Sequence, residues 1–206
     1  MKVGQTSLPN LIPLFIKVIR TIKPSPNLMI DVGCGAGIYG LLFKFYNKLP
    51  KGAMTIGYNL DDKVDLRQYY DLFYEIDLEN HLDYFMRTIN YNLDVKIENV
   101  NNVVINLIEV IEHLEKDKAM FMLKELAKLG LPMFITTPTH FYQSNHPEDP
   151  GYAHKSFYLR KEIVGLLEPF YKYYREFKIF DDIYRTEHQC YVFENNKPID
   201  IPQGRR

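Results

Sequence analysis

The sequence predicts an α/β protein whose strands form a doubly wound, mostly parallel sheet. Seven apolar or alternating runs are typical of strands, and helical stretches separate most of them. The first run leads through a glycine-rich turn into a helix, which is how a parallel crossover unit begins. A chain of 206 residues is long enough to bury one complete α/β core. We therefore expect residues 1–206 to form a single domain.

The expected elements begin with an amphipathic helix over about residues 8–22. Pro9 fits the first turn of this helix, and Pro13 is expected to kink or restart it. Strands are expected at 28–32, 53–58, 72–76, 103–108, 131–137, 172–180 and 188–194, and further helices at 38–48, 81–91, 117–129 and 159–167. Residues from about 195 to 206 are expected to form a loose tail.

Composition excludes several classes of protein. The 25 basic and 26 acidic residues give a net charge of −1, which gives no indication of attraction to nucleic acid or to a membrane. Two cysteines do not make a disulfide framework, so a reducing cytosol is the default compartment. No apolar stretch approaches the ~20 residues of a membrane span, and the N-terminus lacks a signal peptide. We expect a cytoplasmic protein with no membrane partner.

The turn after the first strand is the strongest functional signal. Asp31 interrupts the apolar run, where an acid is costly unless it has a partner. Gly33, Gly35 and Gly37 follow within five residues and precede a helix. Glycine lets the backbone approach a ligand closely, and amide groups at a helix N-terminus favour a negative group. Gly40 completes G-x-G-x-x-G, the dinucleotide fingerprint, but this match alone is weak.

Residues 28–37 read LMIDVGCGAG and resemble the first motif of the class I S-adenosylmethionine-dependent methyltransferases, hhhDhGCGxG. The resemblance implies a Rossmann-like sheet closed by a C-terminal antiparallel hairpin, with S-adenosyl-L-methionine as cofactor. It also implies that the loop holds the methionine end of the cofactor through Asp31, Gly33, Cys34, Gly35 and Gly37. An acid beside amide donors suits that end, which carries an ammonium and a carboxylate. A pyrophosphate would be repelled by Asp31.

The resemblance assigns the rest of the cofactor to the next two strands. The family pattern has an acid at the end of the second strand, where it accepts both ribose hydroxyls. This chain has Asn59 there, with Asp61 and Asp62 close behind, so the contact would have less charge assistance. Asp77 and Leu78 follow the third strand, at the position that meets the adenine ring in the family.

The fourth predicted strand is followed by a second motif. Its sequence resembles the E-x-x-E-H-[LV] of many small-molecule methyltransferases, filled here by Glu109, Glu112, His113 and Leu114. The resemblance implies that Ile108 and Glu109 line the site of methyl transfer and that Glu112 and His113 begin the next helix. His113 could act as a base or could hold the loop, and an isolated Glu-His pair is more often structural.

Residues 139–158 form a long irregular segment after the fifth strand, and loops of this length are usually functional. We expect a substrate-binding loop, because ligands bind at the carboxyl edge of such sheets. His140 and His154 join His113 as candidates to take a proton from an acceptor hydroxyl. A metal site is conceivable from His140, His146, Glu148, Asp149 and His154. Their spacing matches no known zinc pattern, so we expect no metal.

The expected function is methyl transfer to the hydroxyl of a small molecule or glycan, because the chain is compact and lacks an added domain. The N-P-P-Y-type tetrapeptide of DNA amino-group methylation is absent after the fourth strand, although nucleic-acid and protein acceptors remain open. Asn59 and Val103 stand in place of acids, so an inactive methyltransferase-like binding protein is a second hypothesis. A nicotinamide-dependent oxidoreductase built on Gly35, Gly37 and Gly40 is a third.

Overall fold

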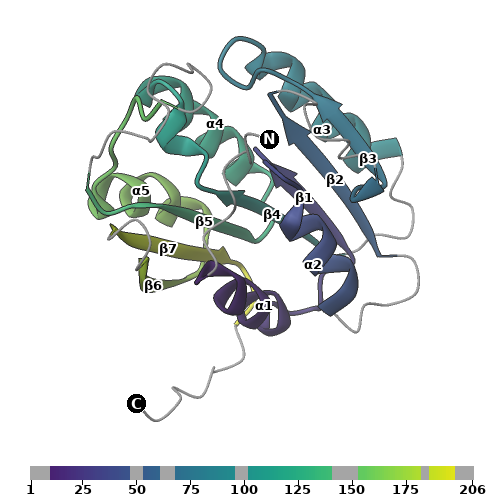
Figure 1. Ribbon diagram of the computed structural model, residues 1–206, viewed down its shortest axis with the longest axis horizontal. Helices are drawn as coiled ribbons and strands as arrows, with labels where there is room; N and C mark the ends of the chain where they lie inside the picture. Colours follow the sequence, from purple (N-terminus) through teal and green to yellow (C-terminus); the bar gives the residue numbers. More distant parts are fainter. Residues whose placement is uncertain are drawn as a thin grey trace, which may run out of the picture.

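A seven-stranded sheet forms the centre of the protein, as the sequence predicts. The computed structural model describes residues 10–46, 53–60, 68–95, 102–140, 153–181 and 186–197. The strands are β1 (Leu28–Val32), β2 (Met54–Asn59), β3 (Leu72–Glu75), β4 (Val103–Ile108), β5 (Met133–Pro138), β6 (Tyr173–Asp181) and β7 (Thr186–Glu194). Their order is β3-β2-β1-β4-β5-β7-β6 (Figure 1). Strands β1 to β5 are parallel, and β7 runs antiparallel to both β5 and β6.

The strand order reverses between β1 and β4. Successive strands step outward from β1 to β3, and the chain then returns to place β4 on the other side of β1. Ligands of open α/β sheets bind outside the carboxyl ends of the strands at such a switch point. The register sets Asp31 of β1 level with Gly57 of β2 and with Asn106 of β4. Side chains from three strands therefore meet beside the glycine loop.

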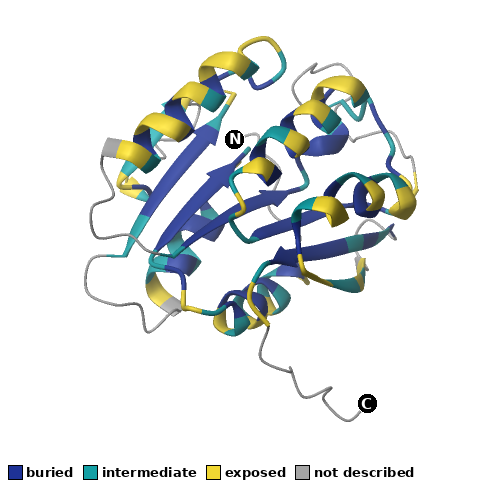
Figure 2. Ribbon diagram, turned by 180° about the vertical axis from the view of Figure 1, so that it is seen from behind, coloured by how far each residue is buried: buried dark blue, intermediate teal, exposed yellow. Residues whose placement is uncertain are grey.

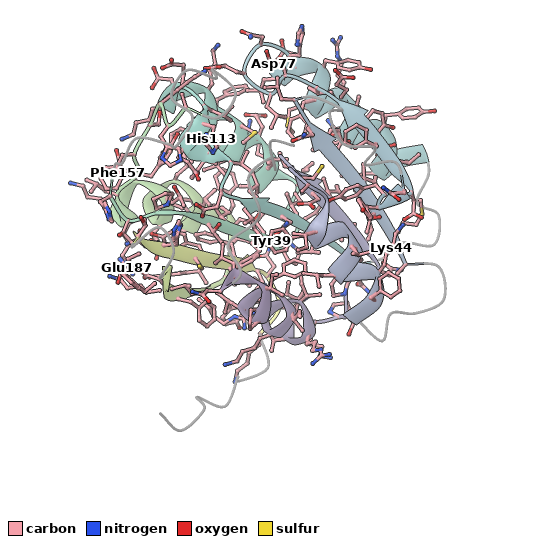
Figure 3. The ribbon with its side chains drawn as sticks, in the orientation of Figure 1. Tyr39, Lys44, Asp77, His113, Phe157 and Glu187 are labelled. Atoms are coloured by element: carbon pink, nitrogen blue, oxygen red, sulfur yellow. The ribbon has the colours of Figure 1, made fainter. Side chains whose placement is uncertain are left out.

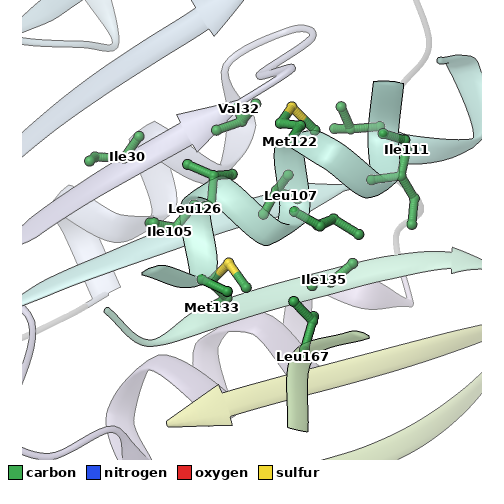
Figure 4. Close-up of a cluster of buried hydrophobic side chains, with 14 of the residues drawn as sticks. Ile30, Val32, Ile105, Leu107, Ile111, Met122, Leu126, Met133, Ile135 and Leu167 are labelled. Atoms are coloured by element: carbon green, nitrogen blue, oxygen red, sulfur yellow. The ribbon is translucent and has the colours of Figure 1, made fainter. Parts of the chain in front are cut away.

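Helices cover both faces of the sheet (Figures 1 and 2). Helices α1 (Leu11–Thr21) and α2 (Ile38–Tyr46) pack on one face, in a core that includes Phe15, Met29 and Phe134. Helices α3 (Leu82–Val95), α4 (Lys116–Lys128) and α5 (Arg160–Leu167) pack on the other. Figure 4 shows Ile30, Ile105 and Ile135 of neighbouring strands facing Met122 and Leu126 of α4. Alternate residues of each central strand thus fill two separate cores, which explains the continuous apolar runs.

Several predicted boundaries change. Helix α3 extends to Val95, beyond the expected 81–91. Pro13 does not kink α1, because it is the third residue of an unbroken helix, where the amide needs no intrahelical partner. The start of the expected tail is attached to the body, since Asn195 and Asn196 donate to the Gly130 and Lys23 carbonyls. Residues 8, 9, 47, 48, 141–152 and 198–206 lie outside the described residues.

The start of the helix after β4 is a further correction. Glu112 and His113 do not begin α4; they belong to η2 (Ile111–His113), a separate turn of 3-10 helix. Leu114 and Glu115 then adopt extended conformations before α4 starts at Lys116. The Glu112 carbonyl instead accepts the backbone amides of two residues from a distant segment, Lys155 and Ser156, at 2.8 and 3.1 Å. No helix in the described parts of the chain is long and apolar enough to cross a membrane.

Candidate functional site

The predicted site residues gather along the carboxyl ends of the parallel strands. Figure 3 shows Asp77 and His113 toward the ends where these strands finish, and Lys44 toward the opposite ends. The glycine loop follows β1, Asn59 closes β2, Glu109 follows β4, and His140 comes just after β5. Four neighbouring strands thus deliver polar groups to one edge of the sheet.

The glycine loop combines one crowded position with one open position. Gly33 has φ +64°, and a Cβ there would lie 2.6 Å from a Val110 methyl group. Gly35 also has a left-handed φ, +51°, but a Cβ there would meet no atom within 4 Å. Gly33 is therefore needed for the fold of the turn, whereas Gly35 exposes backbone to open space. Such a position allows a ligand to approach the main chain closely.

Asp31 has the partners that a buried acid requires. Its side chain is buried, and its two oxygens accept hydrogen bonds from the Tyr70 hydroxyl at 2.5 Å and from Asn106 Nδ2 at 2.6 Å. Burial raises the pKa of Asp31 from 3.8 to about 6, and these two hydrogen bonds limit the rise. Both donors are neutral, so neither of them supplies a positive charge to the ionised group.

Tyr70 is a site residue that the sequence did not reveal. It lies just before β3, and its ring fills the space left by two glycines. A Cβ at Gly40 of α2 would lie 2.5 Å from the ring, and one at Gly57 of β2 would lie 2.9 Å from it. Gly40 therefore has a packing role, apart from any fingerprint. The sequence does show Gly40 and Gly57, which leave room for a large side chain between α2 and β2. It does not show which aromatic residue fills that room.

The two other cofactor candidates on the β2 and β3 side have local partners. Asn59 Oδ1 accepts the Gly35 amide at 3.3 Å, which ties the end of β2 to the glycine loop. Asp77 accepts hydrogen bonds from its own turn: the Glu79 amide at 2.9 Å, the Asn80 amide at 3.2 Å and Asn80 Nδ2 at 2.7 Å. Burial raises the pKa of Asp77, but these hydrogen bonds outweigh it and lower the pKa overall. Leu78 beside it is buried.

Glu109 has an unusual backbone conformation and a partner that the sequence did not indicate. Its φ of +55° is left-handed, which is uncommon for a residue with a side chain. Thr136 Oγ1 of β5 donates to one carboxylate oxygen at 2.8 Å, and His188 Nδ1 of β7 lies 2.9 Å from the other. His188 is completely buried. Its Nδ1 is close enough to the Glu109 carboxylate for an ion pair, but the angle does not suit a hydrogen bond. Ile108 beside Glu109 is also buried.

The structure brings two of the three candidate histidines together with an acid. The His113 and His154 rings meet edge to face with centroids 4.8 Å apart. One ligand atom from each of Glu112, His113 and His154 lies within 4.8 Å of the others. Glu112 is 1% exposed, and neither carboxylate oxygen has a hydrogen bond of good geometry. Burial raises the pKa of Glu112 and the negative charge of Glu109 raises it further, whereas the nearby Thr137 side chain lowers it.

The segment 153–158, at the end of the predicted loop, holds His154 against the η2 turn. Beyond its backbone bonds to Glu112, Ser156 donates its hydroxyl to the Leu114 carbonyl at 2.8 Å. Tyr158 donates to the Ile111 carbonyl at 3.0 Å. Lys155 forms an ion pair with Glu79, which links this segment to the turn after β3. The segment is therefore held around His154 by two backbone hydrogen bonds and by three of its side chains.

His140 lies apart from this cluster. It is exposed just after β5, and its Nδ1 is 3.3 Å from the hydroxyl of the adjacent Thr139. His146, Glu148 and Asp149, which the sequence offered as conceivable metal ligands, lie outside the described residues. The cluster that does form includes Glu112, which was not among those ligands.

Comparison with known proteins identifies the fold. No family model and no curated protein matches the chain. An O-methyltransferase family protein from Burkholderia thailandensis matches with a TM-score of 0.55 and 14% identity over 91% of this chain, which spans 58% of that protein. The N-terminal domain of EvdMO1 with S-adenosylhomocysteine bound matches at 0.58 and 10% identity, covering 94% of this chain and 83% of that one.

A third solved structure is a Burkholderia thailandensis 1,6-didemethyltoxoflavin-N1-methyltransferase with its substrate and S-adenosylhomocysteine bound. It matches with a TM-score of 0.59 and 11% identity, covering 90% of this chain and 78% of that chain. At these identities the similarity establishes a shared Rossmann-like fold with a seven-stranded sheet, as the sequence predicts.

Proposed function

We propose that the chain is an S-adenosylmethionine-dependent methyltransferase. One observation carries the proposal: a glycine loop with open space at Gly35 stands beside the buried acid Asp31, at the switch point of the sheet. Proteins of the same fold are known with S-adenosylhomocysteine bound. These groups fit the methionine end of the cofactor, because its ammonium group would give the Asp31 carboxylate a positively charged partner.

Each cofactor candidate then has a defined role. The backbone at Gly35 approaches the cofactor closely, and Asp31 accepts its ammonium. Asn59 contacts the ribose from the end of β2, in addition to holding the Gly35 amide. Asp77 and Leu78 lie on the adenine side, with Leu78 packing and Asp77 accepting from the ring. When bound, the cofactor supplies an electrophilic methyl group on a sulfonium centre.

The acceptor end of the site is built for a hydroxyl. Ile108 and Glu109 line the end of β4, and the histidines of η2 and of the 153–158 segment lie on the same edge. His113 or His154 takes the acceptor proton as the methyl group is transferred, while the surrounding residues hold the reacting atoms in line and exclude water. The acceptor is proposed to be a small molecule or glycan. The similar proteins include both O- and N-methyltransferases, so a nitrogen acceptor is an alternative to the hydroxyl. A nucleic-acid or protein acceptor is the second candidate.

Calorimetric titration with S-adenosylmethionine, S-adenosylhomocysteine and NADH tests the proposal. We expect micromolar binding of both adenosyl compounds, lost in Asp31→Ala, with no heat from NADH. Asp83→Asn, at an exposed position of α3, is the control for a general effect of removing an acid. Binding of NADH alone would overturn the proposal in favour of an oxidoreductase. Absence of all three would favour the inactive binding protein.

A further inference from the structure

The cluster of Glu112, His113 and His154 has the composition of a metal site. It offers one carboxylate and two imidazoles, with ligand atoms that lie within 4.8 Å of one another. Its three residues come from two segments 40 positions apart, which the backbone and side-chain bonds described above hold together. The arrangement is therefore a product of the fold and does not arise from one local turn.

Glu112 indicates that a positive ligand belongs there. A carboxylate that is 1% exposed and has no hydrogen bond of good geometry is costly, and native structures rarely retain one. A divalent cation would compensate the buried charge.

His113 is oriented as a metal ligand usually is. Its Nδ1 lies 3.2 Å from the Ala153 carbonyl oxygen, the residue just before His154. A neutral imidazole that donates from Nδ1 presents its Nε2 lone pair elsewhere. A carbonyl acceptor on the other ring nitrogen is a common second contact of metal-binding histidines, because it fixes both tautomer and ring orientation.

We propose that Glu112, His113 and His154 bind a divalent transition-metal ion. Two imidazole nitrogens favour zinc, cobalt, iron or manganese over magnesium and calcium, which prefer all-oxygen sites. Three protein ligands leave coordination positions for water or an acceptor oxygen. Ligands about 2.1 Å from a metal lie roughly 3 to 4 Å apart, so the side chains close slightly on binding.

The ion has a chemical role that rests on the proposed function. It would bind the acceptor hydroxyl at the edge where the methyl group is transferred and lower the pKa of that hydroxyl. The hydroxyl proton would pass to solvent water, and the oxygen–methyl bond would form as the sulfonium–methyl bond breaks and S-adenosylhomocysteine leaves as a neutral thioether, with no oxidation or reduction. His113 and His154 would in that case hold the metal and would not themselves act as bases.

The test is cobalt titration of chelator-treated protein, followed by visible absorption and by calorimetry. We expect binding of one cobalt ion with micromolar or tighter affinity and a d–d absorption band, with zinc as competitor. Glu112→Gln and His154→Ala should each weaken cobalt binding at least tenfold. His140→Ala removes a histidine outside the cluster and should leave the cobalt affinity unchanged. His154 is only partly buried, so His154→Ala remains informative should Glu112→Gln fail to fold.

Titration of S-adenosylhomocysteine into each variant separates this inference from the proposed function. Unchanged affinity for S-adenosylhomocysteine together with lost cobalt binding supports a metal site beside the cofactor site. Equal cobalt affinity in wild type, Glu112→Gln and His154→Ala overturns the metal site even if the cofactor binds. Cobalt binding without binding of S-adenosylhomocysteine would sustain the metal site and overturn the methyltransferase proposal.

Discussion

Asp31 and Glu112 are buried acids at the same edge of the sheet, yet their surroundings differ. Asp31 lies within β1, and Glu112 lies just after the neighbouring strand β4. Asp31 is 2% exposed and accepts two short hydrogen bonds from neutral donors. Glu112 is 1% exposed and accepts no hydrogen bond of good geometry. The first carboxyl group is satisfied by the protein before any ligand arrives, whereas the second is not. We infer that Asp31 belongs to a preformed pocket and that Glu112 belongs to a site completed by its ligand.

Exchanging each acid for its amide gives the largest expected contrast. Asp31→Asn should weaken S-adenosylhomocysteine binding by about 100-fold or more, because the ligand ammonium loses a buried charge partner. Glu112→Gln should leave that affinity within about twofold, since the ligand proposed for its carboxylate is the metal ion and not the cofactor. Calorimetry on both variants measures the difference. A comparable loss in both would show that the two acids serve one site.

The unfolding free energy of the unliganded protein should depend on pH through the ionisation of Asp31. Its pKa is raised to about 6 in the folded protein, so the unfolded chain loses this proton first as pH rises. The Asp31 contribution to the free energy of unfolding therefore falls as the pH rises from 4 to 6. The fall amounts to about 3 kcal/mol, because each unit of difference between the folded and unfolded pKa corresponds to about 1.36 kcal/mol. Urea unfolding of wild type and Asp31→Asn across this range isolates the contribution. A constant difference between the two curves would contradict it.

Cofactor binding should depend on the same proton. The ammonium group favours ionised Asp31, so binding below pH 6 must release the proton that the raised pKa retains. We expect the affinity for S-adenosylhomocysteine to fall up to about tenfold per pH unit below 6 and to be level above it. Calorimetry in buffers of different ionisation enthalpy measures the released proton. A pH-independent affinity from 5 to 7 would place the ammonium away from Asp31.

Removing single hydroxyl groups should give the smallest effects and separate the two sites. Tyr70→Phe keeps the ring between Gly40 and Gly57 but removes a donor to Asp31, at a cost of about 1 to 2 kcal/mol in unfolding free energy. It should weaken S-adenosylhomocysteine binding severalfold and leave cobalt binding unchanged. Ser156→Ala should lower the unfolding free energy by about 1 kcal/mol. It should weaken cobalt binding severalfold and leave S-adenosylhomocysteine binding unchanged, because its hydroxyl holds the segment that carries His154. Thermal melts and the two titrations measure both variants.

The fold could be predicted because its signals are local and repeated. Strand β4 begins and ends at the predicted residues, since both of its faces are buried and its apolar run is continuous. The separation of η2 from α4 could not be predicted, because it depends on the Lys155 and Ser156 amides donating hydrogen bonds to the Glu112 carbonyl. Sequence periodicity carries no information on a partner 40 positions away.

The site was predictable only where one strand and its following turn contain it. The left-handed glycines after β1 were expected from spacing, and a partner for Asp31 was required on energetic grounds. The identity of that partner, Tyr70, depends on how the β2–β3 connection packs, and His188 reaches Glu109 across β5 from the antiparallel hairpin. Both contacts are set by tertiary packing, which a single sequence does not specify.

The position of His188 also has a consequence for the order in which the protein is made. Glu109 is followed by nearly 80 residues before the histidine that contacts it appears, and that histidine sits in the last strand. During synthesis, the strands of the parallel core emerge first, with the Glu109 carboxylate lacking this neighbour. This edge of the sheet can therefore reach its final arrangement only after the C-terminal hairpin has left the ribosome and joined β5.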